Sequence, residues 1–259
     1  MKNLNIGIIP VRMNSSRFPG KPLKKIHRIP MLGHICARTS MAEKLDDFYV
    51  ATCDSEIKKY CETINARCIL TSKLHSRASD RTAEAIKKIE LNHKKKVSNI
   101  IMIQGDEPLV HPEMIDNTIS ELNKKNIEVT NIVTEIENNK DWLNPNIIKV
   151  LNDNSNNAIY FSRKPIPFMK KFNSKQTLRQ ICIIGFTRSS LLKFNSLNES
   201  KFEISESIDM NRFIENDIKV RLIRTKKKPF PVDTVQDLRK VSQLMIRDKL
   251  FMKYRENYV

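Results

Sequence analysis

Three cationic side chains follow the first apolar segment of the chain at short spacing. Residues 6–9 are almost all isoleucine, and Pro10 follows them. We expect a buried strand that ends at the proline, which has no N–H for a strand ladder. The loop after it is small and basic, with Arg12, Ser15, Ser16, Arg17, Gly20 and Lys21. Backbone N–H groups and cations in such a loop can hold a phosphate group. A surface loop with solvated cations is the alternative, and the loop matches neither a Walker A nor a GxGxxG motif.

A second candidate for chemistry is the carboxylate of Asp106. It follows the apolar segment 99–103, inside the sequence Gln-Gly-Asp-Glu-Pro at residues 104–108. A carboxylate held rigidly at the end of a buried strand suits a hard cation, and Mg²⁺ is the usual one beside a triphosphate. The alternative is that Asp106 caps the turn before Pro108. A metal site would also need a second carboxylate from elsewhere in the chain.

Segments with the patterns of strands and helices alternate through the first half of the chain. Further strands are expected over 48–52, 67–71 and 99–103, and helices over 32–45, 54–65 and 83–91. This alternation predicts an α/β protein with a parallel, doubly wound sheet. Ligands of such sheets bind where the loops after the strands converge, so we expect Arg12, Lys21 and Asp106 to meet there. Later segments predict strands over 129–137, 147–152, 158–162 and 180–186, and helices over 206–216 and 235–244, with Asp237 serving the N-terminus of the last helix.

Six segments, in this order, carry a resemblance to a known family. They are IPVRMNSSRFPGKPL (9–23), VATCD (50–54), QGDEP (104–108), NPNIIKV (144–150), AIYFSRKPIP (158–167) and VDTVQDL (232–238). Together they resemble the sugar-acid cytidylyltransferases, and most closely the 3-deoxy-manno-octulosonate (Kdo) cytidylyltransferases. The resemblance implies a Rossmann-like nucleotide-diphospho-sugar transferase (GT-A-like) fold. It also implies a homodimer and a single domain over 1–259, with a sugar-binding and dimerisation insertion at about 140–215.

The same resemblance implies a reaction. CTP and a 2-keto-3-deoxy sugar acid would give a CMP-sugar and pyrophosphate, for lipopolysaccharide or surface polysaccharide, without a covalent enzyme intermediate. The implied catalytic residues are Lys21, Asp106, Asp233 and Arg12, with Mg²⁺ on Asp106 and Asp233. The implied nucleotide-binding residues are Pro10, Val11, Arg12, Arg17, Lys21 and Gln104. The sugar-acid residues would be His75, Arg77, Asp80, Arg81, Gln104, Arg163, Gln180, Asp209 and Met210, although Arg163 could equally brace its turn.

The chain departs from the family's usual sequence mainly in the sugar-acid segments. Arg77 and Ala78 stand where the family has Ser and Gly, and Gln180 stands where it has His. Asp209 and Met210 replace Glu and Gln, and Cys182 replaces a Gly in the same segment as Gln180. Cys53 and Pro231 replace an Asp and a Gly in other segments. Two readings follow: a divergent Kdo enzyme, or a pocket changed for another acid such as 8-amino-Kdo or a nonulosonate. A substrate that leaves a buried polar group of the pocket without its hydrogen-bond partner is strongly disfavoured. A few such exchanges can therefore change which sugar acid the enzyme accepts.

Composition restricts the remaining possibilities. The chain has 259 residues, 40% of them hydrophobic, which is enough for a full core. No apolar run is long enough for a membrane span, and no secretory signal precedes the first strand. The five cysteines are odd in number and form no CxxC pair, so we expect free thiols in the cytoplasm. The five histidines are scattered and form no HxxxH pattern, so we expect no zinc site.

The formal net charge of +17 raises the question of nucleic-acid binding. The lysines form short clusters beside Asn-rich stretches, and aromatic residues do not alternate with them as a stacking surface requires. We therefore expect no nucleic-acid partner. Other rivals are a UTP- or GTP-dependent nucleotidyltransferase and a non-catalytic nucleotide-binding relative. The latter should have lost Lys21, Asp106 or Asp233, and the chain keeps all three.

Overall fold

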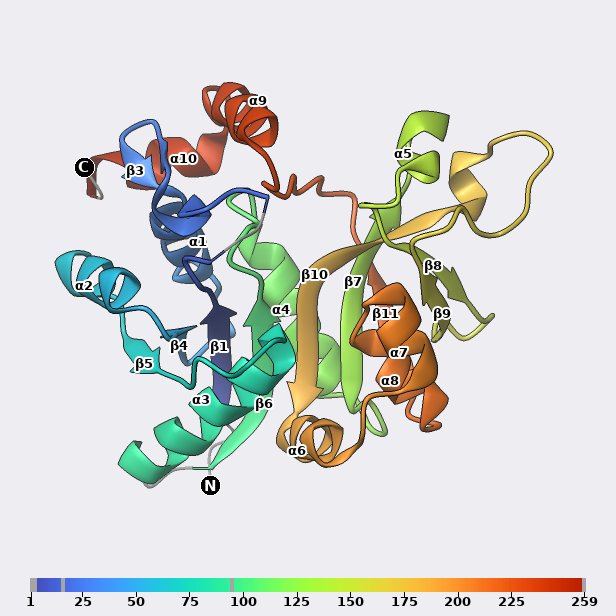
Figure 1. Cartoon of the computed structure of the whole chain (residues 1–259), viewed down its shortest axis with the longest axis horizontal. Helices are drawn as coiled ribbons and strands as arrows, with labels where there is room; N and C mark the ends of the chain where they lie inside the picture. The colour runs from blue at the N-terminus through green and yellow to red at the C-terminus, as the bar shows by residue number, and fades with distance from the viewer. Residues whose placement is uncertain (1–3, 15–16, 94–95, 258–259) are drawn as a thin grey trace. The chain divides into compact units, whose positions relative to one another are not determined.

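The computed structural model describes residues 4–14, 17–93 and 96–257 (Figure 1). Ser15 and Ser16 of the basic loop lie outside the described residues. The chain forms two compact units, one made of residues 1–116 and 229–259 and the other of residues 117–228. The insertion expected at about 140–215 falls within the second unit. None of the described helices is both long and apolar enough to cross a membrane.

The first unit contains a four-stranded parallel sheet in the order β6, β1, β4, β5. The strands are β6 (Val97–Ile103), β1 (Leu4–Pro10), β4 (Asp47–Thr52) and β5 (Cys68–Leu70). Ile8 of β1 pairs with Tyr49 of β4 on one side and with Met102 of β6 on the other. Because β1 has later strands on both sides, the chain winds in two directions from it. The α/β fold with a largely parallel sheet, predicted from the alternation of segments, is thereby confirmed.

Four of the helices of the first unit agree with expected ones in place but not always in length, whereas the last, over residues 249–254, was not predicted. They are α1 (Met31–Thr39), α2 (Ser55–Thr63), α3 (Ala78–His93), α9 (Val235–Met245) and α10 (Lys249–Tyr254). The expectation that the first helix runs to residue 45 is wrong. The chain turns after Thr39, where the Ser40 hydroxyl donates to the carbonyl of Ala37 and the Ala42 N–H donates to that of Thr39. Asp237 caps α9 as predicted, in a reciprocal pair of bonds with Thr234.

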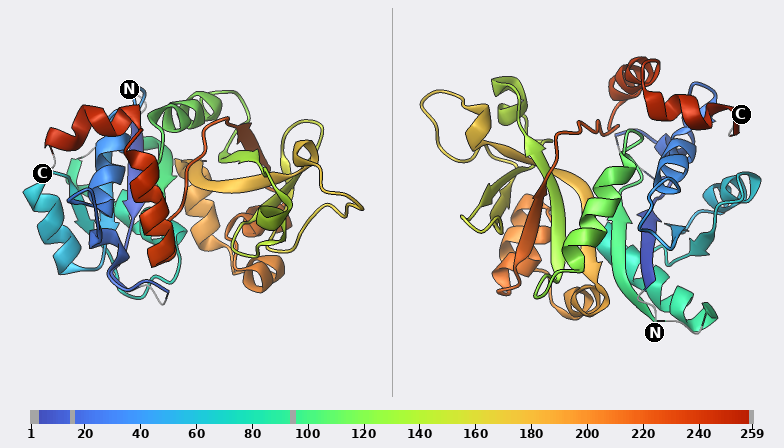
Figure 2. Two further views of the ribbon diagram at one scale, coloured as in Figure 1. Left: turned by 90° about the horizontal axis from the view of Figure 1, so that it is seen from above. Right: turned by 180° about the vertical axis from the view of Figure 1, so that it is seen from behind.

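Helix α10 lies beside α1 (Figure 2). A buried polar network joins these two helices. His34 Nε2 lies 2.9 Å from the carbonyl oxygen of Ile26, so this nitrogen carries the proton and donates. The Tyr254 hydroxyl then donates to His34 Nδ1 at 2.8 Å and accepts from Arg38 Nε at 3.2 Å. Arg38 also forms a 2.8 Å ion pair with Asp248. Burial lowers the pKa of His34 to about 4, so the imidazole is neutral.

The second unit is built on a mixed sheet. Strand β7 (Val129–Glu135) pairs antiparallel with β10 (Leu178–Thr187) and parallel with β11 (Val220–Arg224). A short antiparallel pair, β8 (Lys149–Asn152) and β9 (Ala158–Ser162), joins β10 through β8. The four strands expected in this region are present, whereas β11 was not predicted. The core of this unit is rich in phenylalanine, with Phe161, Phe186, Phe194 and Phe213 all fully buried.

Helices flank this sheet, and the sequence predicted only one of them. They are α5 (Asn139–Leu143), α6 (Arg188–Ser196), α7 (Lys201–Glu206) and α8 (Met210–Glu215), while α4 (Pro112–Leu122) contains the boundary between the two units. The helix expected over 206–216 is present as α8, but its predicted start is wrong, because α8 begins at Met210. Ser207 adopts a left-handed conformation with φ of 54°, which ends α7 and separates it from α8.

Candidate active site

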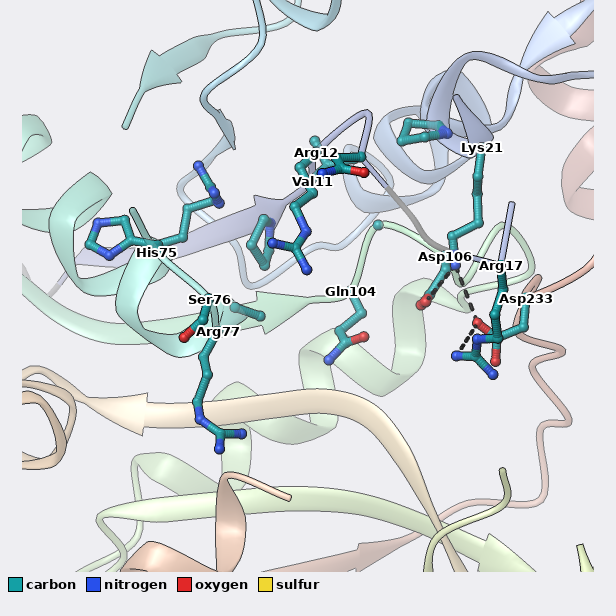
Figure 3. Close-up of a pocket in the computed structure, with 16 residues that line it drawn as sticks. Val11, Arg12, Arg17, Lys21, His75, Ser76, Arg77, Gln104, Asp106 and Asp233 are labelled. Carbon is teal, nitrogen blue, oxygen red and sulfur yellow. Dashed lines mark hydrogen bonds and ion pairs between the residues drawn. The ribbon is translucent and has the colours of Figure 1, made fainter. Parts of the chain in front are cut away.

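A cavity of about 330 Å³ lies in the first unit, at the edge where β1 and β6 end. The loop after β1 lines it with Arg12 and Arg17, and the segment after β6 lines it with Gln104 and Asp106. The start of α3 and the segment before α9 complete the lining. The convergence of Arg12, Lys21 and Asp106 expected from the parallel sheet is thus found. Figure 3 shows Lys21, Arg17, Asp106 and Asp233 as one group, with Arg12 and Gln104 between it and His75, Ser76 and Arg77.

Lys21 is the centre of the charged group. Its Nζ donates to Asp106 Oδ2 at 3.1 Å, to Asp233 Oδ1 at 3.4 Å and to the carbonyl oxygen of Val232 at 2.7 Å. The Lys21 side chain is only 12% exposed, so these contacts are largely shielded from water. Arg17, which is exposed, donates from Nη2 to the same Asp233 oxygen at 3.1 Å. Two carboxylates and two cations therefore balance each other at this end of the cavity.

The segment that carries Asp233 is held at the site by its backbone. The Val232 N–H donates to the carbonyl of Asp106 at 2.9 Å. Asp237 takes no part in this group, because its carboxylate accepts from the backbone and hydroxyl of Thr234 and from the Asp233 N–H. This arrangement separates Asp233, which faces the cavity, from Asp237, which stabilises the helix end.

The basic loop is fixed on both sides of Met13. The Met13 N–H donates to Asp54 Oδ2 at 2.8 Å, and its carbonyl accepts from the Gly20 N–H at 3.0 Å. Gly20 has φ of +70°, a conformation that glycine adopts without strain. The sequence predicts Asp54 or Ser55 as the N-cap of the helix after β4, but the Asp54 side chain makes no capping bond there. The sequence does contain a signal for the contact between Asp54 and the basic loop. Strand β4 is parallel to β1, so an acidic residue just past the end of β4 lies at the same edge of the sheet as the basic loop.

The other side of the cavity is formed by the start of α3. His75 lies 2.5 Å from Glu84 Oε2 through Nε2. Burial favours the neutral form of Glu84, but hydrogen bonds from Lys88, the Ser72 N–H and His75 outweigh it and lower the pKa of Glu84 to about 2. Arg81 is buried and donates to Thr71 Oγ1 and the Ser72 carbonyl. Of the sugar-acid residues expected in this unit, His75, Arg77, Arg81 and Gln104 line the cavity, whereas Asp80 lies in the first turn of α3 without lining it.

Four further residues expected to contact the sugar acid belong to the second unit. Arg163 donates from Nε to the Glu206 carbonyl at 2.7 Å and from Nη1 to the Pro145 carbonyl at 3.1 Å, so it braces its turn. Gln180 is buried and donates from Nε2 to Asn131 Oδ1 at 2.6 Å. Asp209 precedes the first turn of α8, and Met210 is fully buried there.

Lys149, in the same unit, was not among the expected site residues. It is fully buried, and its Nζ donates to the carbonyls of Asn144, Ile147 and Arg163 at 2.6–2.8 Å. Burial, followed by the nearby Arg163 charge, lowers the pKa of Lys149 to about 8. Lys149 thus ties the loop at 144–147 to the turn that carries Arg163.

The donor set suits Mg²⁺ better than a transition metal. Asp106 Oδ2 and Asp233 Oδ1 lie 3.1 and 3.4 Å from the same Lys21 nitrogen, so the two carboxylates face one position in the cavity. No cluster of three or more His, Cys, Asp or Glu side chains suited to a metal occurs in the described ranges of the chain. Mg²⁺ commonly takes one or two carboxylates and completes its shell with water and phosphate oxygens. The two aspartates therefore fit a magnesium ion that arrives with a polyphosphate.

Comparisons with known proteins identify the family and the fold of the chain. A family described as Cytidylyltransferase matches residues 6–223. The chain is 37% identical over 243 residues to the 3-deoxy-manno-octulosonate cytidylyltransferase of Thermodesulfovibrio yellowstonii, covering 91% of this chain and 95% of that relative. It is 33% identical over 243 residues to the 8-amino-3,8-dideoxy-manno-octulosonate cytidylyltransferase of Shewanella baltica, covering 93% and 98%. A solved structure, CMP:2-keto-3-deoxy-manno-octonic acid synthetase complexed with CTP, matches with a TM-score of 0.85 at 28% identity, over 95% of this chain and 99% of that one.

Proposed function

This chain belongs to the cytidylyltransferase family, and from that premise we propose that it couples CTP to a 3-deoxy keto-sugar acid of the octulosonate type. The products are a CMP-sugar and pyrophosphate. The observation that carries the proposal is Lys21 held between Asp106 and Asp233 beside a basic loop. Such a site neutralises polyphosphate charge and orients a hydroxyl for attack on phosphorus.

The cavity residues of the first unit have separate roles in this reaction. Arg12, Arg17 and Lys21 bind the triphosphate and stabilise the charge that moves to the leaving pyrophosphate. Pro10, Val11 and Gln104 line the cavity beside them and contact the nucleotide. Asp106 and Asp233 would hold Mg²⁺, which when bound lowers the pKa of the attacking sugar hydroxyl and orients the phosphate. Positioning and electrostatics account for the rate, so no nucleophilic side chain is required.

The acceptor is a sugar acid, bound next to the triphosphate. Of the residues that the family resemblance implies for it, His75, Arg77, Arg81 and Gln104 line the cavity of the first unit. The two relatives above are named for Kdo and for 8-amino-Kdo, and the exchanges at Arg77, Gln180 and Met210 keep both acceptors open. Kdo is our first choice. The protein would act as a homodimer in the cytoplasm, and its product would serve lipopolysaccharide or surface polysaccharide synthesis.

A pyrophosphate-release assay with Mg²⁺ and CTP tests the proposal. The acceptor panel is Kdo, 8-amino-Kdo, sialic acid and a legionaminate-type acid, with UTP as the nucleotide control. Asp106→Asn and Asp233→Asn should each lower kcat/KM by at least about 100-fold. Asp217→Asn is the matched control, because Asp217 is an exposed aspartate in the second unit, and it should leave the rate unchanged. Absence of release with every acceptor would reject the catalytic assignment and favour a nucleotide-binding protein on the same fold.

A further inference from the structure

The three hydrogen-bond donors of the Lys21 ammonium have three oxygen acceptors. They are Asp106 Oδ2, Asp233 Oδ1 and the Val232 carbonyl, at 3.1, 3.4 and 2.7 Å. An ammonium group has three donors, so these contacts use its full capacity. The two carboxylate oxygens are also those that would ligate a divalent ion. Lys21 and the metal would therefore compete for the same oxygens.

The charge balance supports the same conclusion. In the structure, Asp106 and Asp233 are compensated by Lys21 and Arg17, so the group has a formal charge of zero. A divalent ion that entered beside Lys21 would meet a cation at contact distance in a partly buried site. A triphosphate changes this balance, because its phosphate oxygens offer Lys21 new acceptors and compensate the metal.

The backbone around Lys21 allows its side chain to move alone. Lys21 begins the short helix η1 (Lys21–Leu23), and its N–H donates to the Phe18 carbonyl at 3.2 Å. The Lys24 N–H donates back to the Lys21 carbonyl at 3.1 Å. The main chain is thus fixed on both sides, while the four-carbon side chain can rotate to carry the ammonium toward a phosphate group.

We propose that Lys21 is an internal competitor for the metal site. In the nucleotide-free protein its ammonium holds the position between Asp106 and Asp233, and it transfers to the polyphosphate when metal and nucleotide enter together. Metal binding and nucleotide binding are then cooperative, since each favours the displaced position of Lys21. The inference rests on the proposed function, because the phosphate group of the nucleotide is what draws Lys21 away.

The test is a titration of the nucleotide-free protein with Mn²⁺. The electron paramagnetic resonance signal of free Mn²⁺ measures how much of the ion is bound. Lys21→Met should bind Mn²⁺ at least tenfold more tightly than the unaltered protein, and Lys21→Gln should act in the same direction. Adding Asp106→Asn to Lys21→Met should abolish the gain. Lys24→Met is the matched control, because it removes one exposed positive charge three residues away, and it should change the affinity by less than twofold. Thermal unfolding of each variant checks that the fold is intact.

A second titration measures the coupling. CTP should raise the Mn²⁺ affinity of the unaltered protein strongly and that of Lys21→Met much less. Equal Mn²⁺ affinity of the two nucleotide-free proteins would overturn the proposal, whether both bind tightly or neither binds. Pyrophosphate release by the unaltered protein separates the two questions. Release without a Lys21 effect on Mn²⁺ rejects only the competition, whereas failure of release rejects the proposed function.

Discussion

Asp54 offers the most direct test of how the basic loop is held. Its Oδ2 accepts the Met13 N–H at 2.8 Å, and the Cys53 thiol lies 3.7 Å from the same oxygen. In Asp54→Ala the Met13 N–H loses its acceptor. The stability of the following helix, α2, should be unchanged, because the Asp54 side chain makes no capping bond to it. The loss should therefore appear as poorer order of the loop that carries Arg12 and Arg17.

The magnitude follows from the type of bond. A hydrogen bond to a charged acceptor contributes about 1.5–3 kcal/mol. A tenfold change in affinity corresponds to about 1.4 kcal/mol, so complete loss would weaken nucleotide binding by roughly 10- to 150-fold. The bond is only part-buried, and water replaces some of it, so we expect the lower part of this range, about 10- to 30-fold. Asp54→Asn keeps an acceptor oxygen in place and should recover most of the loss.

The assay is steady-state pyrophosphate release with CTP varied at saturating acceptor, together with urea unfolding. Asp54→Ala should raise the KM for CTP and change kcat much less, because the metal-binding carboxylates are untouched. Two results would refute the reasoning. One is an unchanged KM with a lower free energy of unfolding, which would make Asp54 purely a fold-stabilising residue. The other is an Asp54→Asn variant as impaired as Asp54→Ala at normal stability.

Three further predictions concern stability. The pKa of His34 is about 4 in the native protein and 6.5 in the unfolded chain, so the unfolded chain binds more protons below pH 6.5. The free energy of unfolding should therefore fall by about 3 kcal/mol between pH 6.5 and 4. In urea titrations over this pH range, the His34→Gln variant should lose part of this pH dependence. Lys149→Met leaves three carbonyls without their donor and should destabilise the second unit by about 2–4 kcal/mol, read from urea midpoints with the exposed Lys175→Met as control. Gly185→Ala places a Cβ 2.5 Å from both Thr118 Cγ2 and Thr130 Oγ1 and should cost about 1–3 kcal/mol in the same titration.

The parts of the fold that the sequence predicted are those fixed by local patterns. The apolar runs of β1, β4 and β6 form buried strands because burial removes their apolar side chains from water. Their parallel order follows from the helices that connect them. Asp237 was assigned correctly to the start of α9, since a capping pair is formed within four residues. The end of α1 and the break between α7 and α8 were missed, because each depends on one turn residue rather than on periodicity.

The contacts at the site could not be predicted from local patterns. Lys21 meets the Val232 carbonyl and Asp233 across more than two hundred residues of sequence, and no periodicity encodes that approach. The role of Asp54 was also missed, because its position after a strand suggested a helix cap. Resemblance to a family named Asp106 and Asp233 as partners, but only the coordinates show that one lysine binds both.

The backbone positions Asp106 and Asp233 by different contacts, and these contacts determine how a Lys21 variant can be interpreted. Asp106 follows β6, whose place beside β1 is set by parallel pairing. Asp233 lies between strand and helix, and its segment is held by the Val232 N–H, which donates to the Asp106 carbonyl at 2.9 Å. Main-chain bonding thus joins the two segments independently of the Lys21 ammonium. Removal of that ammonium should leave the carboxylates near each other, with only Arg17 to compensate them. A gain in Mn²⁺ affinity would therefore report the lost competitor rather than a rebuilt site.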